Sequence, residues 1–347
     1  MTGKNNAAYM TAIRRFEMKE IPVPEPEKGE LLVKIKYIGI CGSDAHFWDS
    51  GMRKGKYFDL PFLLGHEFSA EVVKTGPDVK EFRPGDRITF EPQITCGVCE
   101  FCKSGRYNIC PNVIFPSVPP YDGALRNYMT IPAANAYKLP DNMSMIQGAL
   151  IEPLAVGLSA AEKGEVKLGK TVTLLGAGPI GLTTLLACKA MGASRIIVSD
   201  LQQSRGEMAL KLGATDFINA SEQDAVAEIL RLTDGKGTDV VFETAGSSQT
   251  AAITSDLVKR GGLIVLVGNI NTETRYRFMD LMYKEAQIRP IYRYRNNFRM
   301  AIDAVAGGLI PIEQIVTRIY PFSEVQQAYT DSIENQKDVI KILIEME

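Results

Sequence analysis

A chain of 347 residues, of which 45% are hydrophobic and 23% charged, has the composition of a folded soluble protein and the length of two domains. Its net charge of -2, without blocks of like charge, argues against nucleic acid or a membrane as partner. No apolar run is long enough to span a membrane, and the first residues lack the apolar core of a signal peptide, so we expect a cytoplasmic protein that acts on small molecules.

Short strands dominate the first 150 residues. Residues 31–38 alternate between apolar and polar as a strand does, and residues 65–92 continue as short strands with turns at Gly76-Pro77 and at 84–86. Helices look scarce before residue 145. This spacing predicts a small β-rich unit.

From about residue 154 the pattern changes to strands and helices in alternation. Strand-like and helical segments occur at 171–175, 180–191, 195–199, 206–212, 239–243 and 262–267. Such alternation predicts βαβ units around a parallel sheet.

After about residue 292 the pattern changes again. Helices are expected at 298–306 and 323–332, and strands at 315–320 and 339–344. This last segment looks too short to bury a core of its own, so we expect it to complete the first unit. The sequence therefore predicts an α/β protein, with residues 1–153 and 293–347 in one discontinuous domain and residues 154–292 in an inserted one.

A glycine-rich motif, Gly176-Ala177-Gly178-Pro179-Ile180-Gly181, joins the first strand of the inserted block to its first helix. The glycines permit a tight turn and a close approach to a pyrophosphate, whose charge the helix N-terminus favours. Asp200 ends the next strand, where a carboxylate can accept hydrogen bonds from ribose hydroxyls and would repel a 2′-phosphate. The motif therefore predicts a dinucleotide site that prefers NAD to NADP.

Two further features bear on this site. Arg205 follows Asp200 and can either pair with a 2′-phosphate or lie solvated at a helix start, which leaves some use of NADP open. Val267, Gly268 and Asn269 end a later strand, where the sheet would meet the nicotinamide half of the cofactor. An ordinary turn is the alternative for these three residues.

Four cysteines, Cys96, Cys99, Cys102 and Cys110, fall within one short loop. Four thiolates close a tetrahedral zinc site that has no open position, so such a site is structural. Disulfides would need an oxidising compartment, and an iron–sulfur cluster is a minor alternative.

A second metal constellation would use one of the chain's two histidines. His66 stands beside Glu67, and Cys41 follows the strand 31–38, so the three side chains could meet in space. One thiolate, one imidazole and one carboxylate leave a fourth zinc position open, as catalysis requires. A core histidine and a buried cysteine are the alternatives. Glu152 lies in an apolar run, where its carboxylate needs a partner that a metal, its water or a simple hydrogen bond could supply.

Several motifs occur together and in an order typical of one enzyme family. They are Gly39-Ile40-Cys41-Gly42-Ser43-Asp44, Gly65-His66-Glu67, Gly85-Asp86-Arg87, the four-cysteine loop, Glu152-Pro153-Leu154 and the glycine motif. The combination covers nearly the whole chain and resembles the zinc-dependent medium-chain dehydrogenases. Within that family, residues 41–48, 151–152 and 292–294 look most like sorbitol dehydrogenases and their xylitol-oxidising relatives.

The resemblance implies a GroES-like catalytic domain built from both chain ends and a Rossmann NAD-binding domain between them. It implies two zinc ions per chain. One would be structural, and one would be catalytic on Cys41, His66 and Glu67, with Glu152 acting through a bound water. A homotetramer is the assembly that it suggests.

The resemblance also implies the reaction. Hydride would pass from the secondary hydroxyl of a polyol such as sorbitol, xylitol or L-iditol to NAD, giving a ketose. Ser43 could hydrogen-bond the alkoxide, and His46 could carry the proton outward. Arg293 and Tyr294 match residues that face the polyol and the cofactor. Phe47 stands where sorbitol dehydrogenases often carry a tyrosine that can touch substrate, so the preferred polyol and its stereochemistry stay open.

Two other functions compete with this one. A related zinc dehydrogenase could act on threonine, butanediol or another secondary alcohol, because zinc and hydride chemistry do not select the chain. A zinc protein that recognises nucleic acid or protein through its cysteine loop is the non-enzymatic alternative. The net charge and the second, open metal constellation count against it.

Overall fold

The computed structural model describes residues 3–53, 55–270 and 272–346, and these form two compact units. The first comprises Met1–Glu152, Phe298–Gly308 and Val316–Glu347, and the second comprises Pro153–Asn297 and Leu309–Ile315. The inserted unit thus extends past residue 292 and takes a short piece of the C-terminal segment, which the sequence had placed in the first domain.

The first unit is built mainly from β-strands. One sheet has the order β10-β8-β7-β3-β18-β17, with β9 also paired to β3, and a smaller sheet has the order β2-β1-β6. The strands are β1 (Asn5–Ala12), β2 (Arg15–Ile21), β3 (Glu30–Gly39), β4 (Met52–Arg53), β5 (Lys56–Tyr57), β6 (Phe62–Leu63), β7 (Glu67–Thr75), β8 (Arg87–Phe90), β9 (Tyr128–Pro132), β10 (Ala136–Lys138), β17 (Val316–Pro321) and β18 (Lys341–Glu345).

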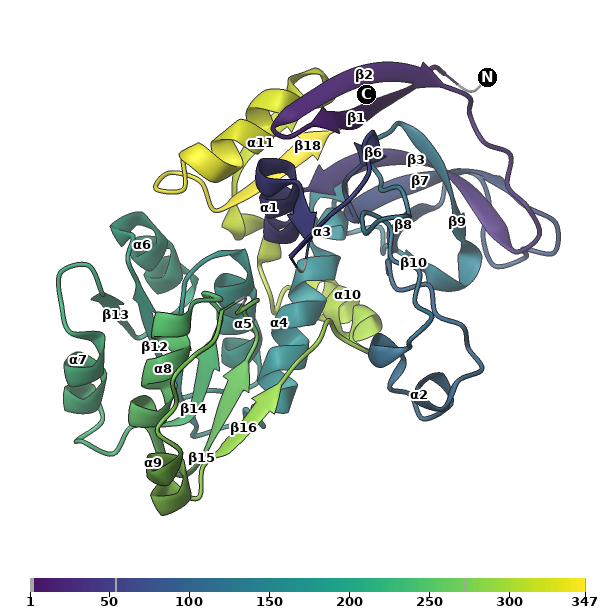
Figure 1. Ribbon diagram of the computed structural model, residues 1–347. Helices are drawn as coiled ribbons and strands as arrows, with labels where there is room; N and C mark the ends of the chain where they lie inside the picture. The colour runs from purple at the N-terminus through teal and green to yellow at the C-terminus, as the bar shows by residue number, and fades with distance from the viewer. Residues whose placement is uncertain (1–2, 54, 271, 347) are drawn as a thin grey trace. The chain divides into compact units, whose positions relative to one another are not determined.

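Five short helices accompany these strands. They are α1 (Gly42–Ser50), α2 (Glu100–Lys103), α3 (Met145–Ala149), α10 (Phe298–Ala306) and α11 (Val325–Glu334), and α4 (Ile151–Lys163) leads into the second unit. Figure 1 shows α11 and β18, in yellow, beside α1 and the purple hairpin of β1 and β2. The strands and helix near the C-terminus therefore share a core with the N-terminal strands.

Helix α1 differs from the expectation that helices are scarce in this region. It begins after Cys41 and ends at Gly51, which adopts a left-handed conformation. Its buried residues include a carboxylate, Asp44, together with Phe47 and Trp48. Because a charged residue occupies the buried face, the segment lacks the apolar periodicity by which a helix is predicted.

The second unit is a six-stranded parallel sheet with the order β13-β12-β11-β14-β15-β16. Helices α8 and α9 pack on β14 and β15 (Figure 1). The elements are β11 (Thr171–Leu175), α5 (Pro179–Ala190), β12 (Arg195–Asp200), α6 (Gln203–Leu212), β13 (Asp216–Asn219), α7 (Ala225–Leu232), β14 (Thr238–Glu243), α8 (Ser248–Leu257), β15 (Val258–Leu266), α9 (Phe278–Lys284) and β16 (Gln287–Pro290). The order reverses between β11 and β14, the place where doubly wound sheets bind ligands.

The glycine motif lies at this switch point, in the turn from β11 to α5. Gly176 has φ +107°, which an L side chain rarely adopts, and Pro179 opens the helix at its first turn. A Cβ on Gly181 would lie 2.1 Å from the Gly176 carbonyl oxygen. The predicted roles of the glycines in turning and close packing therefore have a physical basis here.

Among the described residues, no helix is long and apolar enough to cross a membrane.

We expect Gly181→Ala to lower the free energy of unfolding by about 1–3 kcal/mol, because its methyl group would collide with backbone. Gly178→Ala is the matched control, since the nearest atom to its Cβ would be 3.9 Å away. Denaturant unfolding of the two variants measures the difference. Equal stabilities would contradict the packing role of Gly181.

Candidate active site and metal centres

Cys41, His66 and Glu67 come together at the adjoining ends of two strands. Antiparallel pairing of β3 with β7 places Gly39 opposite Glu67, so Cys41 and His66 fall just beyond the paired residues. One ligand atom from each of the three side chains lies within 4.8 Å of the others. His66 and Glu67 are 4% and 1% exposed, whereas Cys41 is partly accessible. This set of donors fits a zinc ion that keeps a further position open.

Asp44 fixes the orientation of His66. Its fully buried carboxylate lies 3.1 Å from the His66 Nδ1 and accepts hydrogen bonds from Ser117 Oγ at 2.8 Å and from the Gly65 amide at 3.0 Å. Arg53 pairs with the same carboxylate. Because Nδ1 faces a carboxylate, Nε2 is the nitrogen left for a metal. Asp44 belongs to the motif at residues 39–44, but the sequence alone gave no sign of its role.

Charge controls protonation in this cluster. Burial opposes the ionisation of Asp44, but His66 and Arg53 outweigh it and hold the pKa of this carboxyl below its usual range. Burial likewise opposes the imidazolium form, yet Asp44 and Cys41 raise the pKa of His66 well above its ordinary value. A proton and a metal ion compete for the same imidazole, so metal binding weakens as the pH falls.

A buried lysine completes the surroundings of Glu67. Lys341, at the start of β18, is 1% exposed, forms an ion pair with Glu67 and donates from Nζ to the Ile40 carbonyl at 2.9 Å. Pairing of β18 with β3 brings it there, since Leu343 lies opposite Gly39. The sequence interpretation missed this residue. A charged residue inside an otherwise apolar closing strand was the signal that could have found it.

The other predicted catalytic and substrate residues of this unit lie on two helices. In α1, Ser43 donates from Oγ to the Cys41 sulfur at 3.3 Å, and His46 is exposed. Phe47 is fully buried, with edge-on ring contacts to two other phenylalanines. Glu152 is buried in the first turn of α4 and lies outside the three-residue ligand group. Their roles toward substrate, proton and water stay predictions.

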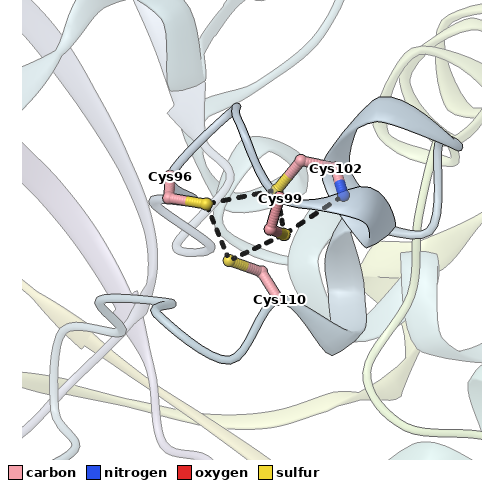
Figure 2. Close-up of side chains that lie close together, drawn as sticks. All are labelled: Cys96, Cys99, Cys102 and Cys110. Atoms are coloured by element: carbon pink, nitrogen blue, oxygen red, sulfur yellow. Dashed lines mark hydrogen bonds between the residues drawn. The ribbon is translucent and has the colours of Figure 1, made fainter.

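The four loop cysteines form a compact cluster, and Figure 2 shows their sulfur atoms facing one another. Neighbouring Sγ atoms lie 3.5–3.9 Å apart across four pairs. Zinc–sulfur bonds of about 2.3 Å in a tetrahedron place sulfurs about 3.8 Å apart, whereas a disulfide needs about 2.05 Å. None of the four cysteines forms a disulfide. The cluster therefore fits a closed zinc site and excludes the disulfide alternative.

Backbone amides in this loop donate hydrogen bonds to the cysteine sulfurs and stabilise their thiolate form. Hydrogen bonds from the backbone of Val98 and Cys99 lower the pKa of Cys96 to about 6. The Cys99 sulfur caps α2 by accepting from the Cys102 amide at 3.5 Å. Both contacts favour the thiolate, which is the form that binds metal.

The predicted NAD residues surround the turn after β11. The Asp200 carboxylate accepts hydrogen bonds from the Ala177 amide at 2.7 Å and from the Gln202 amide at 2.9 Å. The first of these bonds holds the carboxylate against the glycine motif. Arg205 also lies near the motif, since its Nη1 would be 3.9 Å from a Cβ on Gly178. Its buried Nε has no hydrogen-bond partner in the described part of the chain. Pro179 and Ile180, the other predicted members, open α5.

The second half of the predicted cofactor site lies at the ends of β14 and β15. The amides of Val267 and Gly268 both donate to the Glu243 carbonyl at 2.9 Å. A Cβ on Gly246 would lie 3.1 Å from the Asn269 backbone. The sequence interpretation did not single out Glu243 or Gly246. Their strand-end position in the pattern was the only signal for them.

Arg293 and Tyr294 follow β16. Arg293 has φ +57°, and its guanidinium stacks 4.7 Å from the centre of the Tyr292 ring. Tyr294 is buried. Contact of either residue with substrate or cofactor stays a prediction.

We expect Asp44→Asn to weaken metal binding at Cys41, His66 and Glu67 by about 10- to 100-fold, because it removes the anion that orients and polarises His66. The dissociation constant, measured by competition with a chelator at several pH values, should rise as the pH falls in both proteins. Asp49→Asn, on the exposed side of the same helix, is the control. Equal affinities for the Asp44 and Asp49 variants would contradict this role.

Known protein families resemble this chain in both of its units. The alcohol dehydrogenase GroES-like domain model matches residues 27–141, and the zinc-binding dehydrogenase model matches residues 179–307. Sorbitol dehydrogenase of Bacillus subtilis is 40% identical over 342 residues, which cover 97% of this chain and 96% of that protein. A probable D-xylulose reductase A of Arthroderma otae is 36% identical over 334 residues, 94% of each chain.

A solved structure is also similar to this chain. An Escherichia coli oxidoreductase/dehydrogenase of unknown specificity superposes with a TM-score of 0.96 at 41% identity, covering 99% of this chain and 100% of that one. The predicted fold class, a GroES-like domain with a Rossmann domain, and the predicted cofactors, zinc and NAD, are confirmed. The chain belongs to the zinc-dependent medium-chain dehydrogenase family and is an NAD-dependent zinc dehydrogenase of the sorbitol-dehydrogenase-like kind.

Proposed function

We propose that the chain oxidises a secondary hydroxyl of a polyol such as sorbitol, xylitol or L-iditol to a ketone. Hydride passes to NAD, and one proton is released. The observation that carries this proposal is the convergence of Cys41, His66 and Glu67 on one partly accessible point. Similarity to a sorbitol dehydrogenase and a D-xylulose reductase supports a polyol as the substrate.

Zinc held by these three side chains would supply a Lewis acid that lowers the pKa of a bound hydroxyl. The chain's own residues would do the rest. Asp44 would keep His66 in the metal-binding tautomer, and Ser43, which donates to the Cys41 sulfur, would hydrogen-bond the substrate oxygen. His46 is exposed on the same helix, where it can pass a proton to solvent.

A second zinc in the four-cysteine loop would act on stability alone, because four thiolates leave no open position. Glu152, buried just before the second unit, would hold a water on the catalytic zinc. The carboxylate of Asp200 against the glycine motif favours NAD over NADP. Arg205 beside it leaves some use of NADP possible.

We also propose a cytoplasmic homotetramer. Helix α9 exposes large apolar side chains, Phe278, Met279, Met282 and Tyr283, and β16 lies at the edge of its sheet. Exposed apolar surface of this kind is typical of an interface between subunits.

A related dehydrogenase acting on threonine, butanediol or another secondary alcohol is the alternative. A panel of polyols and diols, assayed separately with NAD and NADP by the absorbance of the reduced cofactor, distinguishes the two. We expect turnover of sorbitol, xylitol or L-iditol with NAD, together with two zinc ions per chain. Turnover of diols or threonine alone would overturn the polyol assignment.

Glu67→Gln should lower turnover in this assay by at least about 100-fold, because it removes an anionic ligand. Glu71→Gln is the control, since Glu71 lies on the same strand and is paired at the surface with Lys36. Full activity and full zinc content in Glu67→Gln would contradict the role of Glu67 as a ligand.

A further inference from the structure

The ion pair between Lys341 and Glu67 has an unusual setting. Both side chains are buried, at 1% exposed each, and the lysine Nζ also donates to the Ile40 carbonyl at 2.9 Å. Ile40 directly precedes Cys41. One ammonium group therefore contacts both chain segments that carry the proposed zinc ligands.

The surrounding backbone leaves room for this ion pair. A Cβ on Gly39 would lie 3.1 Å from the Lys341 Cε and 3.2 Å from its Nζ, and closer still to the Glu67 carboxylate. A larger residue at this position of β3 would therefore crowd both partners of the ion pair. The contact is thus built into the sheet, because β18, β3 and β7 are adjacent strands.

The charges in this pocket decide what the lysine does. Asp44 is balanced by Arg53, whereas Glu67 has Lys341 as its only ion-pair partner among the described residues. A buried carboxylate that loses its cationic partner destabilises the folded protein. A divalent cation bound to Glu67 can take the place of the lysine as that partner. Lysine and metal therefore compete electrostatically for the same carboxylate.

On the basis of the proposed function, we infer that Lys341 is a positioning residue. It fixes the Glu67 carboxylate in place and reduces the negative charge that this carboxylate offers to the catalytic metal. By sharing the charge of Glu67, the ammonium makes metal binding weaker than the three ligands alone would give. It also leaves more positive charge at the metal for the substrate oxygen. The ammonium thereby lowers the affinity for the metal and makes the bound hydroxyl more acidic.

The test measures metal affinity with cobalt(II) as the probe, after a chelator has emptied the open site. The closed four-thiolate site should release its metal more slowly than the open one. We expect Lys341→Met to bind cobalt about tenfold more tightly than the wild type, because a repelling charge is removed. Its turnover should fall, whereas Lys341→Arg should keep affinity and turnover within a few-fold of the wild-type values.

Lys36→Met is the matched control. Lys36 pairs with Glu71 at 3.1 Å on the exposed faces of the same two strands, β3 and β7. It should leave cobalt affinity unchanged. Lys341→Gln, which keeps an N–H donor, is a second variant without the charge and should tighten cobalt binding as Lys341→Met does.

The outcomes separate this inference from the proposed function. General damage to the site would weaken cobalt binding and lower turnover together, so tighter binding with slower turnover supports the inference. Unchanged or weaker cobalt binding in both Lys341→Met and Lys341→Gln would overturn it. If the wild type shows no cobalt–thiolate absorption that depends on Cys41, the proposed function itself fails.

Discussion

The antiparallel pairing of β3 with β7 is the constraint on which the candidate active site depends. It fixes Gly39 opposite Glu67 and so brings the cysteine that follows one strand to the histidine that precedes the other. A shift of one residue would turn Glu67 to the opposite face of the sheet. The metal-binding geometry is therefore a property of sheet register, and the buried core of this unit holds that register in place.

Buried charge is the second organising feature. Asp44 and Glu67 are buried carboxylates of the candidate site, and each has a cationic partner from a different element. Asp44 acts on the metal through His66, whereas Lys341 acts through Glu67. The chain thus surrounds the proposed ligands with opposing charges. One carboxylate strengthens a ligand, and one ammonium weakens another.

Much of this could be predicted from sequence where chemistry is carried by local spacing. The four cysteines lie within one short stretch of sequence and the glycines within another, so their spacing alone indicates a zinc loop and a dinucleotide turn. The alternation of strands and helices indicated the inserted sheet. Lys341 could not be assigned a partner, because its contact with Glu67 joins residues 274 positions apart. Residues 309–315, which the sequence grouped with the first unit, pack with the second, and their packing partners lie far away in the chain.

A metal ion is proposed to bind Cys41, His66 and Glu67 at the adjoining ends of β3 and β7. Anomalous diffraction at the zinc absorption edge, from crystals of the purified chain, tests it most directly. We expect two peaks per chain, one among the loop cysteines and one within bonding distance of the Cys41 sulfur, the His66 Nε2 and a Glu67 oxygen. A single peak in the cysteine loop, with none at Cys41, would contradict it.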